Sequence, residues 1–266
     1  MMPKTIRVHY HVSQDSETLA LTTADCIASA VERAIAGQGV ARIAISGGNT
    51  PQRTFELLAD PFHSFRGRID WSHLQLFWVD ERCVPPTDKN SNFRMTQQVL
   101  LSKVPLPEEN IVRIEGELAP EEAAARYESA LRNRFRMEGA EVPRFDFIHL
   151  GLGDNGHTAS LFPHSDALDS LMRLAVAVHV EADVPWRVTL TWPVINHAAQ
   201  VVFQVQGASK ADVLHRVFEG AYQPDVLPAQ LIRPGSGELT LLLDASAAAQ
   251  LPPPDREGNG LMEVTG

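Results

Sequence analysis

The chain has 266 residues, 44% of them hydrophobic and 21% charged, so it is long enough to bury a large apolar core without disulfides or metals. Its formal net charge of −10 argues against nucleic acid and against an anionic membrane surface as a main partner. Cys26 and Cys83 have neither a CxxC spacing nor a zinc-site spacing, which is typical of reduced cytosolic thiols.

Targeting segments are not expected in this sequence. Residues 1–17 contain no apolar segment followed by a small-residue cleavage site, so we predict no secretory signal. No apolar run approaches the length that a bilayer-spanning helix needs. We therefore expect a cytoplasmic protein.

Apolar runs alternate with helical patterns along the chain. Residues 19–35 follow a helical period that Gly37 can end, and Ala41–Ile45 predicts a strand. Pro51 suits the first turn of a helix that continues through Leu58. Further strands are expected at 74–79, 145–150, 175–180, 188–190, 201–205 and 239–243, and further helices at 92–101, 120–137 and 208–218.

These elements predict an α/β fold. Strands rich in Val, Ile and Leu that are separated by helices form a mostly parallel sheet with helices on both faces. No internal repeat or linker divides the pattern, so we expect a single domain over residues 1–251. Residues 252–266 begin with three prolines and have little apolar pattern, which predicts a loose C-terminal tail.

Three of the predicted strands end in unusual polar sequences. They are Ser46 to Thr50, Asp80-Glu81-Arg82, and Gly151 to His157. Ligands of open α/β sheets bind beyond the carboxyl ends of the strands, so we expect these segments to converge on a site. The turn at 46–50 precedes a helix whose free N–H groups suit a phosphate, although an ordinary tight turn between strand and helix explains the local sequence equally well.

The segment Gly151–Gly156 matches GxGxxG after a strand, so a dinucleotide site is an alternative reading. His157 follows the last glycine directly, and Pro163 comes too soon for a long crossover helix. An imidazole accepts a proton near neutral pH, which makes His157 the candidate general base. Asp154 is close enough in sequence to orient it.

Three basic residues near strand ends could hold an anion. Arg82 offers paired donors for a phosphate or a carboxylate, while Arg187 and Lys210 are further candidates or ordinary surface cations. Although the chain has ten histidines, it has no HExxH motif, and we expect no bound metal.

Taken in order, these segments resemble the 6-phosphogluconolactonase family, which is related in fold to glucosamine-6-phosphate deaminases and isomerases. The resemblance runs from about Ala41 to Asp244. Its parts are Ile45–Pro51, Trp78–Arg82, Ser91-Asn92, Gly151–Pro163, Arg187–Thr191, Asn196 and Gly207–Ala211.

The resemblance implies a Rossmann-like domain that hydrolyses 6-phospho-D-glucono-1,5-lactone to 6-phospho-D-gluconate in the oxidative pentose phosphate pathway. We expect no cofactor. His157 matches the catalytic histidine of the family, and Arg82 matches its active-site arginine. Lys210 matches a lysine near the phosphate, and the turn at 46–50 matches the sugar-phosphate loop. We expect His157 to activate the water that attacks the lactone.

We therefore predict three catalytic residues, His157, Asp154 and Arg82. The predicted substrate and phosphate contacts are Ser46, Gly47, Gly48, Asn49, Thr50, Asp80, Asn155, Gly156, Arg187 and Lys210. The expected partner is a small sugar phosphate lactone, with no nucleic acid and no membrane, and the expected assembly is a monomer or weak homodimer.

Two positions depart from the family pattern. Asn155 stands where the family often has an aspartate, and Asp154 precedes it. Leu241–Leu243 stand where the family often has a tryptophan before the aspartate matched by Asp244. The alternatives are an amino-sugar phosphate isomerase or deaminase, a non-enzymatic sugar-phosphate sensor, and a dinucleotide oxidoreductase. Leu161-Phe162-Pro163 and Arg82 favour the lactonase over the deaminase.

Overall fold

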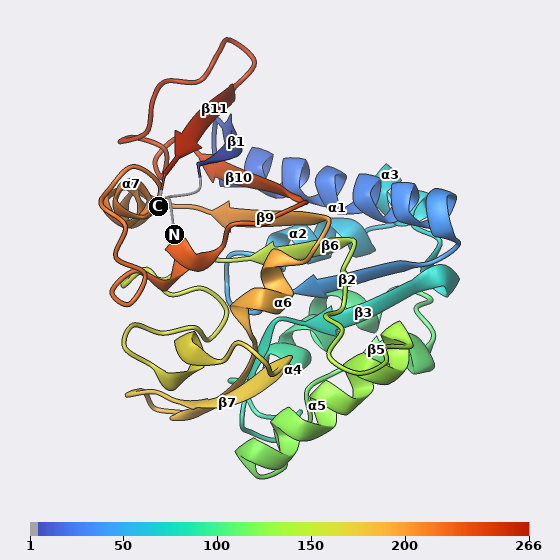
Figure 1. The fold of residues 1–266 in the computed structure, drawn as a ribbon. Helices are drawn as coiled ribbons and strands as arrows, with labels where there is room; N and C mark the ends of the chain where they lie inside the picture. Colours follow the sequence, from blue (N-terminus) through green and yellow to red (C-terminus); the bar gives the residue numbers. More distant parts are fainter. Residues whose placement is uncertain (1–4, 266) are drawn as a thin grey trace.

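The computed structural model describes residues 5–265, so residues 1–4 of the predicted domain and Gly266 of the predicted tail lie outside it. The described residues form a single α/β domain around an eight-stranded sheet of order β11-β1-β10-β9-β6-β2-β3-β5 (Figure 1). The strands of this sheet are β1 (Ile6–Ser13), β2 (Ala41–Ile45), β3 (Leu74–Trp78), β5 (Ile111–Val112), β6 (Phe147–Leu150), β9 (Gln200–Val205), β10 (Glu238–Asp244) and β11 (Asn259–Val264).

Every neighbouring pair in this sheet is parallel except β1 and β11. The predicted α/β fold with a mostly parallel sheet is confirmed. The helices are α1 (Ser16–Gln38), α2 (Gln52–Ala59), α3 (Ser64–Arg68), α4 (Asn92–Thr96), α5 (Pro120–Phe135), α6 (Trp192–Asn196) and α7 (Ala211–Phe218).

The two faces of the sheet are covered by different helices. Helix α1 packs against β1, β2, β6, β10 and α2 (Figure 1), and Phe55 of α2 meets the ring of His149 in β6. Helix α5 covers the opposite face, where Phe135 packs against Phe77 and Phe145. Strands buried on both faces must be apolar throughout, which explains why all four residues of β6 are buried.

Helix boundaries follow local capping. Asp15 begins α1 by accepting a hydrogen bond from the Thr18 N–H at 2.8 Å. The helix ends at Gly39, whose φ of 79° is left-handed and whose N–H bonds to the Ile35 carbonyl. The sequence predicts the end at Gly37, but only Gly39 takes the left-handed conformation that closes the last turn.

Three strands form a separate small sheet of order β4-β8-β7. Its members are β4 (Asp80–Arg82), β7 (Ala175–His179) and β8 (Trp186–Leu190), and both pairings are antiparallel. The sequence predicts β7 and β8 as strands without distinguishing them from those of the main sheet. Only a short loop joins them, which permits an antiparallel hairpin but not a parallel crossover.

The predicted loose tail at 252–266 is wrong over β11, which pairs antiparallel with β1 at the edge of the main sheet. The Tyr10 hydroxyl also donates to the Pro252 carbonyl at 2.9 Å. Met262 and Val264 are buried while Glu263 is exposed, so the strand is amphipathic with a period of two. Only two residues carry that alternation, which is too short to stand out in the sequence.

The chain order of the strands creates the cleft. From β2 the chain moves outward through β3 to β5, then returns to β6 on the other side of β2 and moves outward through β9 and β10. The connections after β2 and β6 therefore diverge, and a crevice opens between the carboxyl ends of these two strands. The polar segments after β2, β3, β6 and β9 meet at that edge.

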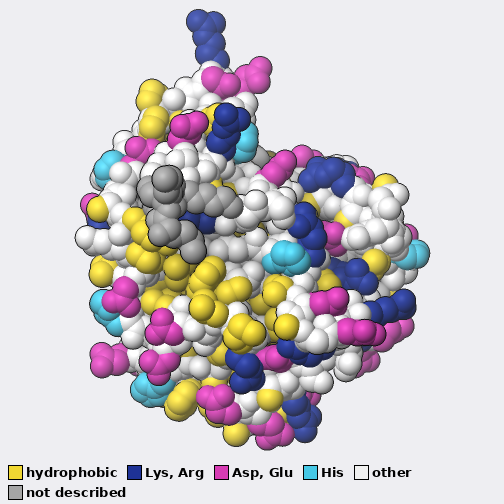
Figure 2. Space-filling view, in the orientation of Figure 1, with side chains coloured by type: hydrophobic (Ala, Val, Ile, Leu, Met, Phe, Trp, Pro, Cys, Tyr) yellow, Lys and Arg dark blue, Asp and Glu magenta, His cyan; other side chains and the backbone are white. Residues whose placement is uncertain are grey.

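None of the helices in residues 5–265 is long and apolar enough to cross a membrane. The space-filling view shows acidic, basic and histidine side chains interspersed over one face of the molecule (Figure 2).

Tyr127 attaches α5 to the last residue of β3, just before the acidic pair. Its buried hydroxyl donates to the Trp78 carbonyl at 2.6 Å and accepts from the Trp78 N–H at 3.2 Å. We expect Tyr127→Phe to lower the free energy of unfolding by about 1–3 kcal/mol, because two buried backbone groups lose their partner. Urea denaturation measures the change.

Tyr222→Phe is the matched control for this prediction. The Tyr222 ring is 42% exposed and lies under the Arg233 guanidinium, an arrangement that phenylalanine keeps. A change within about 0.5 kcal/mol is expected there. Equal losses in the two variants would contradict the role of the buried hydroxyl.

Candidate active site

A cavity of about 220 Å³ lies at the carboxyl edge of the sheet. It brings together most of the residues predicted from sequence, from five separate segments of the chain. Those that line it are Ser46, Gly47, Gly48, Asn49, Thr50, Asp80, Arg82, His157, Arg187 and Lys210. Asp154, Asn155 and Gly156 are not among the lining residues.

The turn after β2 forms one wall of the cavity. The Ser46 hydroxyl donates to the His149 carbonyl at 2.7 Å, which ties the turn to β6. Gly47 lies against the Asn92 side chain, where a Cβ atom would come within 1.9 Å of the Asn92 Oδ1, and Gly48 has a φ of 93°. Both glycines are therefore required by geometry. The turn leads directly into α2, and Asn49, Thr50 and Pro51, which precede this helix, line the cavity.

Asp80 and Glu81, which follow β3, have different roles. Glu81 is almost fully buried and accepts hydrogen bonds from the N–H groups of Arg82, Asn92 and Phe93 at 2.7–2.8 Å, and from the Ser91 hydroxyl at 3.0 Å. Burial raises the pKa of its carboxyl, which these hydrogen bonds oppose. Glu81 thus anchors the start of α4 and is not free to contact a ligand.

Asp80 lines the cavity and is held in place from two sides. Its Oδ2 accepts from the Ser160 hydroxyl at 2.7 Å, and its Oδ1 accepts from the Asn92 Nδ2 at 3.2 Å. Ser160 belongs to the segment after His157, so the Asp80 carboxylate connects the end of β3 to the histidine loop.

His157 lies on a loop that its glycines shape. The Gly153 N–H donates to the His157 carbonyl at 2.8 Å, and Gly156 has a φ of 78°. A Cβ atom on Gly153 would lie 2.1 Å from two atoms of the imidazole, so the ring packs directly over that glycine. On another side the ring stacks on Phe162, with centroids 4.2 Å apart.

The loop does not continue as a nucleotide-binding helix. After Gly156 the chain makes an isolated antiparallel bridge between Thr158 and Leu161, and the next helical turn, at Asp166–Asp169, is a single 3₁₀ turn. A dinucleotide site of this kind needs a helix that opens at the last glycine. The GxGxxG pattern therefore serves here to turn the chain toward His157.

Burial lowers the pKa of His157 to about 4, and the positive charges of Lys210 and Arg187 act in the same direction. The carboxylates of Asp80 and Asp154 oppose this shift only in part. At neutral pH the ring is therefore uncharged and has one nitrogen that can accept a proton.

Asp154 does not contact the imidazole, contrary to the prediction that it orients His157. Its carboxylate pairs with the Lys210 ammonium at 2.5 Å, and its side chain is 80% exposed. The side-chain oxygen that meets the imidazole belongs to the next residue, Asn155, whose Oδ1 lies 2.6 Å from the His157 Nδ1. The local turn points these two neighbouring side chains in different directions.

Two arginines are neighbours on adjacent strands of the small sheet. Arg82 on β4 is paired with Arg187 on β8, and the Arg82 Nη1 donates to the Asn90 carbonyl at 2.6 Å. Within residues 5–265 neither guanidinium forms an ion pair. Burial lowers the pKa of Arg187, and repulsion from Arg82 lowers it further, so the pair favours a bound anion.

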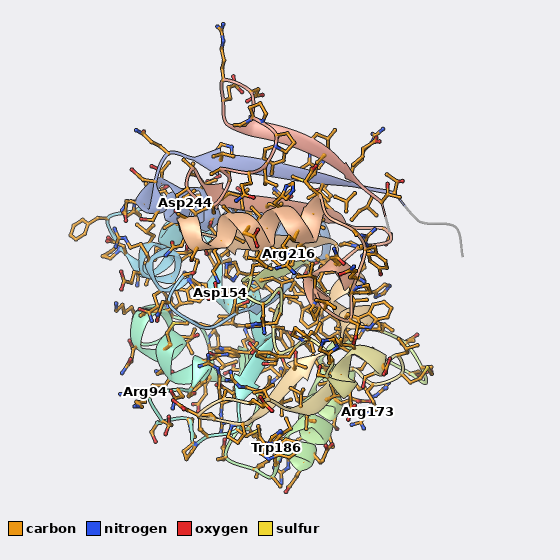
Figure 3. All side chains as sticks on the ribbon, turned by 90° about the vertical axis from the view of Figure 1, so that its left-hand side faces the viewer. Arg94, Asp154, Arg173, Trp186, Arg216 and Asp244 are labelled. Carbon is orange, nitrogen blue, oxygen red and sulfur yellow. The ribbon has the colours of Figure 1, made fainter. Side chains whose placement is uncertain are left out.

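Lys210 is placed by the segment that follows β9. The Asp244 carboxylate, at the end of β10, accepts from the Gly207 N–H at 3.0 Å and from the Ala247 N–H at 2.7 Å. Gly207 has a φ of 97°, which turns the chain back over the cleft toward Lys210. Asp244 lies at the far end of α7 from Arg216 in Figure 3, and Asp154 lies below that helix.

Several lining residues were not predicted from sequence, among them His149, Gln204 and Phe162. The His149 Nε2 and the Gln204 Oε1 are 2.9 Å apart, and the Gln204 Nε2 donates to the Thr54 hydroxyl at 3.0 Å. Burial lowers the pKa of His149 to about 4, so it is neutral as well. In the sequence, His149 and Gln204 are each a polar residue inside an otherwise apolar strand, and this is the signal that could have identified them.

The sequence and the fold of this chain are both similar to those of known 6-phosphogluconolactonases. The family model for glucosamine-6-phosphate isomerases/6-phosphogluconolactonase matches residues 14–241. A 6-phosphogluconolactonase of Synechocystis sp. is 42% identical over 86% of this chain and 92% of its own, and one of Nostoc sp. is 37% identical over 94% and 99%. The solved 6-phosphogluconolactonase of Trypanosoma cruzi is 28% identical, with a TM-score of 0.80 over 91% of this chain and 96% of its own.

We predict that Gly153→Ala displaces the imidazole of His157, because its Cβ would overlap the ring. The expected cost in unfolding free energy is about 1–3 kcal/mol, as for other overpacked sites. Gly151→Ala is the control, since a Cβ there meets nothing within 4 Å. NMR of the histidine ring signals should show a shift for His157 in the first variant alone, and unchanged signals in both would contradict the packing argument.

Proposed function

Because the chain belongs to the 6-phosphogluconolactonase family of the glucosamine-6-phosphate isomerase superfamily, we propose that His157 is the general base with which it hydrolyses 6-phospho-D-glucono-1,5-lactone. The chain is a hydrolase of this family, and lactone opening in the pentose phosphate pathway is the activity that the family relationship supports. The observation that carries the histidine role is a half-buried imidazole on the cavity wall, with its Nδ1 2.6 Å from the Asn155 Oδ1. Burial lowers the pKa of this ring to about 4, which favours its uncharged form at neutral pH.

The proposed reaction needs no covalent intermediate. A lactone is already an activated ester, so a water molecule is a sufficient nucleophile. The His157 Nε2 takes a proton from this water as its oxygen bonds to C1, and the same proton then goes to the ring oxygen as the bond between C1 and that oxygen breaks. General-base assistance of this kind is worth about 10²–10⁴-fold in rate.

Charge develops on the carbonyl oxygen during the attack. We assign its stabilisation to Arg82, which lines the cavity, together with backbone N–H groups at the strand ends. Asp80 faces the same space and supports the reaction as a contact for substrate hydroxyl groups.

The phosphate is assigned to the turn at 46–50 together with two of the cations that line the cavity. The turn at 46–50 supplies N–H and hydroxyl donors, and Lys210 and Arg187 supply positive charge. Holding the phosphate fixes the position of the lactone carbonyl relative to His157, so that phosphate binding orients the reacting group. A bound phosphate would also offset the cations that lower the pKa of His157.

Two features of the cavity also favour the lactonase over the deaminase. Phe162, within Leu161-Phe162-Pro163, stacks on the catalytic imidazole, and Arg82 lines the cavity. We propose further that the protein acts in the cytoplasm, as a monomer or weak homodimer, without nucleic acid or membrane partners. The net charge of −10 supports the last point.

The central prediction is that His157→Ala lowers kcat for lactone hydrolysis by about 10²–10⁴-fold, because the water loses its base. The rate must be measured against spontaneous opening of the lactone, by following acid release at near-neutral pH. His73→Ala is the control, since His73 is half exposed and bonded to Asp70 far from the cavity. Near wild-type activity in His157→Ala would contradict the general-base role.

A second prediction separates phosphate binding from chemistry. Lys210→Met should lower kcat/KM for 6-phosphogluconolactone by roughly tenfold to a hundredfold, the worth of one charged hydrogen bond. Lys210→Met should leave the slow hydrolysis of unphosphorylated glucono-1,5-lactone unchanged. The remote control Lys103→Met should leave the hydrolysis of both lactones unchanged. Equal losses on both lactones would assign Lys210 to the reacting end of the substrate.

A further inference from the structure

We propose that Asn155 is a positioning residue that holds His157 in the tautomer with a bare Nε2, and that it does so without contributing a charge. The inference rests on the proposed role of His157 as base. It concerns the position at which the family often has an aspartate.

The orientation of the Asn155 amide is fixed by the backbone. Its Oδ1 lies 3.3 Å from the His157 backbone N and 2.6 Å from the His157 Nδ1. A backbone N–H can only donate, so the atom that faces it must be the amide oxygen and not the amide nitrogen. One oxygen therefore accepts from both groups.

The tautomer follows from that orientation. Because the Asn155 oxygen can only accept, the His157 Nδ1 must carry the proton. In a neutral imidazole the second nitrogen is then an acceptor, and within residues 5–265 no protein hydrogen bond reaches the His157 Nε2. Stacking on Phe162 and packing over Gly153 prevent the ring from turning to exchange its two nitrogens.

The absence of charge on Asn155 determines how the base responds to pH. The charged groups that act on His157 come from four elements. They are Asp80 of β4, Arg187 of β8, Lys210 before α7 and Asp154 of its own loop. The two carboxylates and the two cations act in opposite directions, and burial is the largest single cause of the shift, so the pKa falls to about 4.

A carboxylate in place of the Asn155 amide would change that balance. It would lie in hydrogen-bond contact with the Nδ1 proton and would stabilise the imidazolium ion. The base would then become protonated at higher pH, and its activity would be lost earlier on acidification. The amide retains the hydrogen bond that sets the tautomer and keeps the base uncharged over a wider range of pH.

The first experiment is independent of catalysis. Nitrogen NMR of the wild-type protein, labelled in histidine, reports which nitrogen of His157 carries the proton near pH 7. The expected result is a protonated Nδ1 and a bare Nε2, with a titration midpoint near pH 4, as burial requires. A ring with its proton on Nε2 would overturn the proposal.

The second experiment compares Asn155→Asp and Asn155→Ala by pH profiles of kcat. For Asn155→Asp we expect kcat at pH 8 within about threefold of wild type, and an acid limb that moves to higher pH by about 1–3 units, the effect of an opposite charge in contact. For Asn155→Ala we expect kcat to fall by about tenfold or more with KM changed by less than about threefold, because the tautomer is no longer fixed.

The control is Asn133→Asp, which places the same charge on the exposed surface of α5 and should leave the acid limb in place. If Asn155→Ala fails to fold, the Asn155→Asp profile and the wild-type tautomer still decide the question. Wild-type kcat and pH profile in both Asn155 variants, alongside an inactive His157→Ala, would refute the Asn155 role alone. An active His157→Ala would refute the general-base proposal, whatever the tautomer.

Discussion

The return of the chain from β5 to β6, beside β2, is the constraint on which the site depends. It places the carboxyl ends of β9, β6, β2 and β3 side by side, so four connections that are far apart in sequence share one edge of the sheet. Backbone hydrogen bonds fix this order, and buried apolar side chains on both faces hold it. A change in the register of β6 against β2 would move His157 relative to the turn at 46–50 without altering either segment.

The polar connections reinforce one another across the cleft. The Ser46 hydroxyl binds the His149 carbonyl, and the Asp80 carboxylate binds the Ser160 hydroxyl. Glu81 takes four hydrogen bonds from Arg82 and from the segment at 91–93. A buried carboxylate is costly unless it is fully hydrogen-bonded, so Glu81 makes the geometry at the start of α4 strict. Arg82 and Arg187 line the cavity and form no ion pair with any residue in 5–265, so they are available to an anionic ligand in a protein that is acidic as a whole.

Much of the framework could be predicted from the sequence because its signals are local and periodic. The run Ala41–Ile45 is β2 to the residue, and the strand ends pointed to the cleft. The tail strand β11 was missed because its alternation is short, and its pairing with β1 depends on contacts such as the Tyr10 ring over Gly260. His149 and Gln204 were missed because each is a single polar residue in an apolar run, and only the three-dimensional fold brings them together.

Asp154 and Asn155 have different roles that their positions in the sequence do not distinguish. Both are within three residues of His157, and a carboxylate is the more common partner of an imidazole, so proximity favoured Asp154. The structure reverses the choice through backbone geometry. The left-handed Gly156 and the hydrogen bond from Gly153 to His157 fold the loop so that the Asn155 side chain returns to the ring, while the Asp154 side chain extends outward to Lys210. Spacing along the chain therefore identifies the loop that carries the base, but the left-handed turn at Gly156 and the hydrogen bond from Gly153 to His157 determine which neighbour holds it.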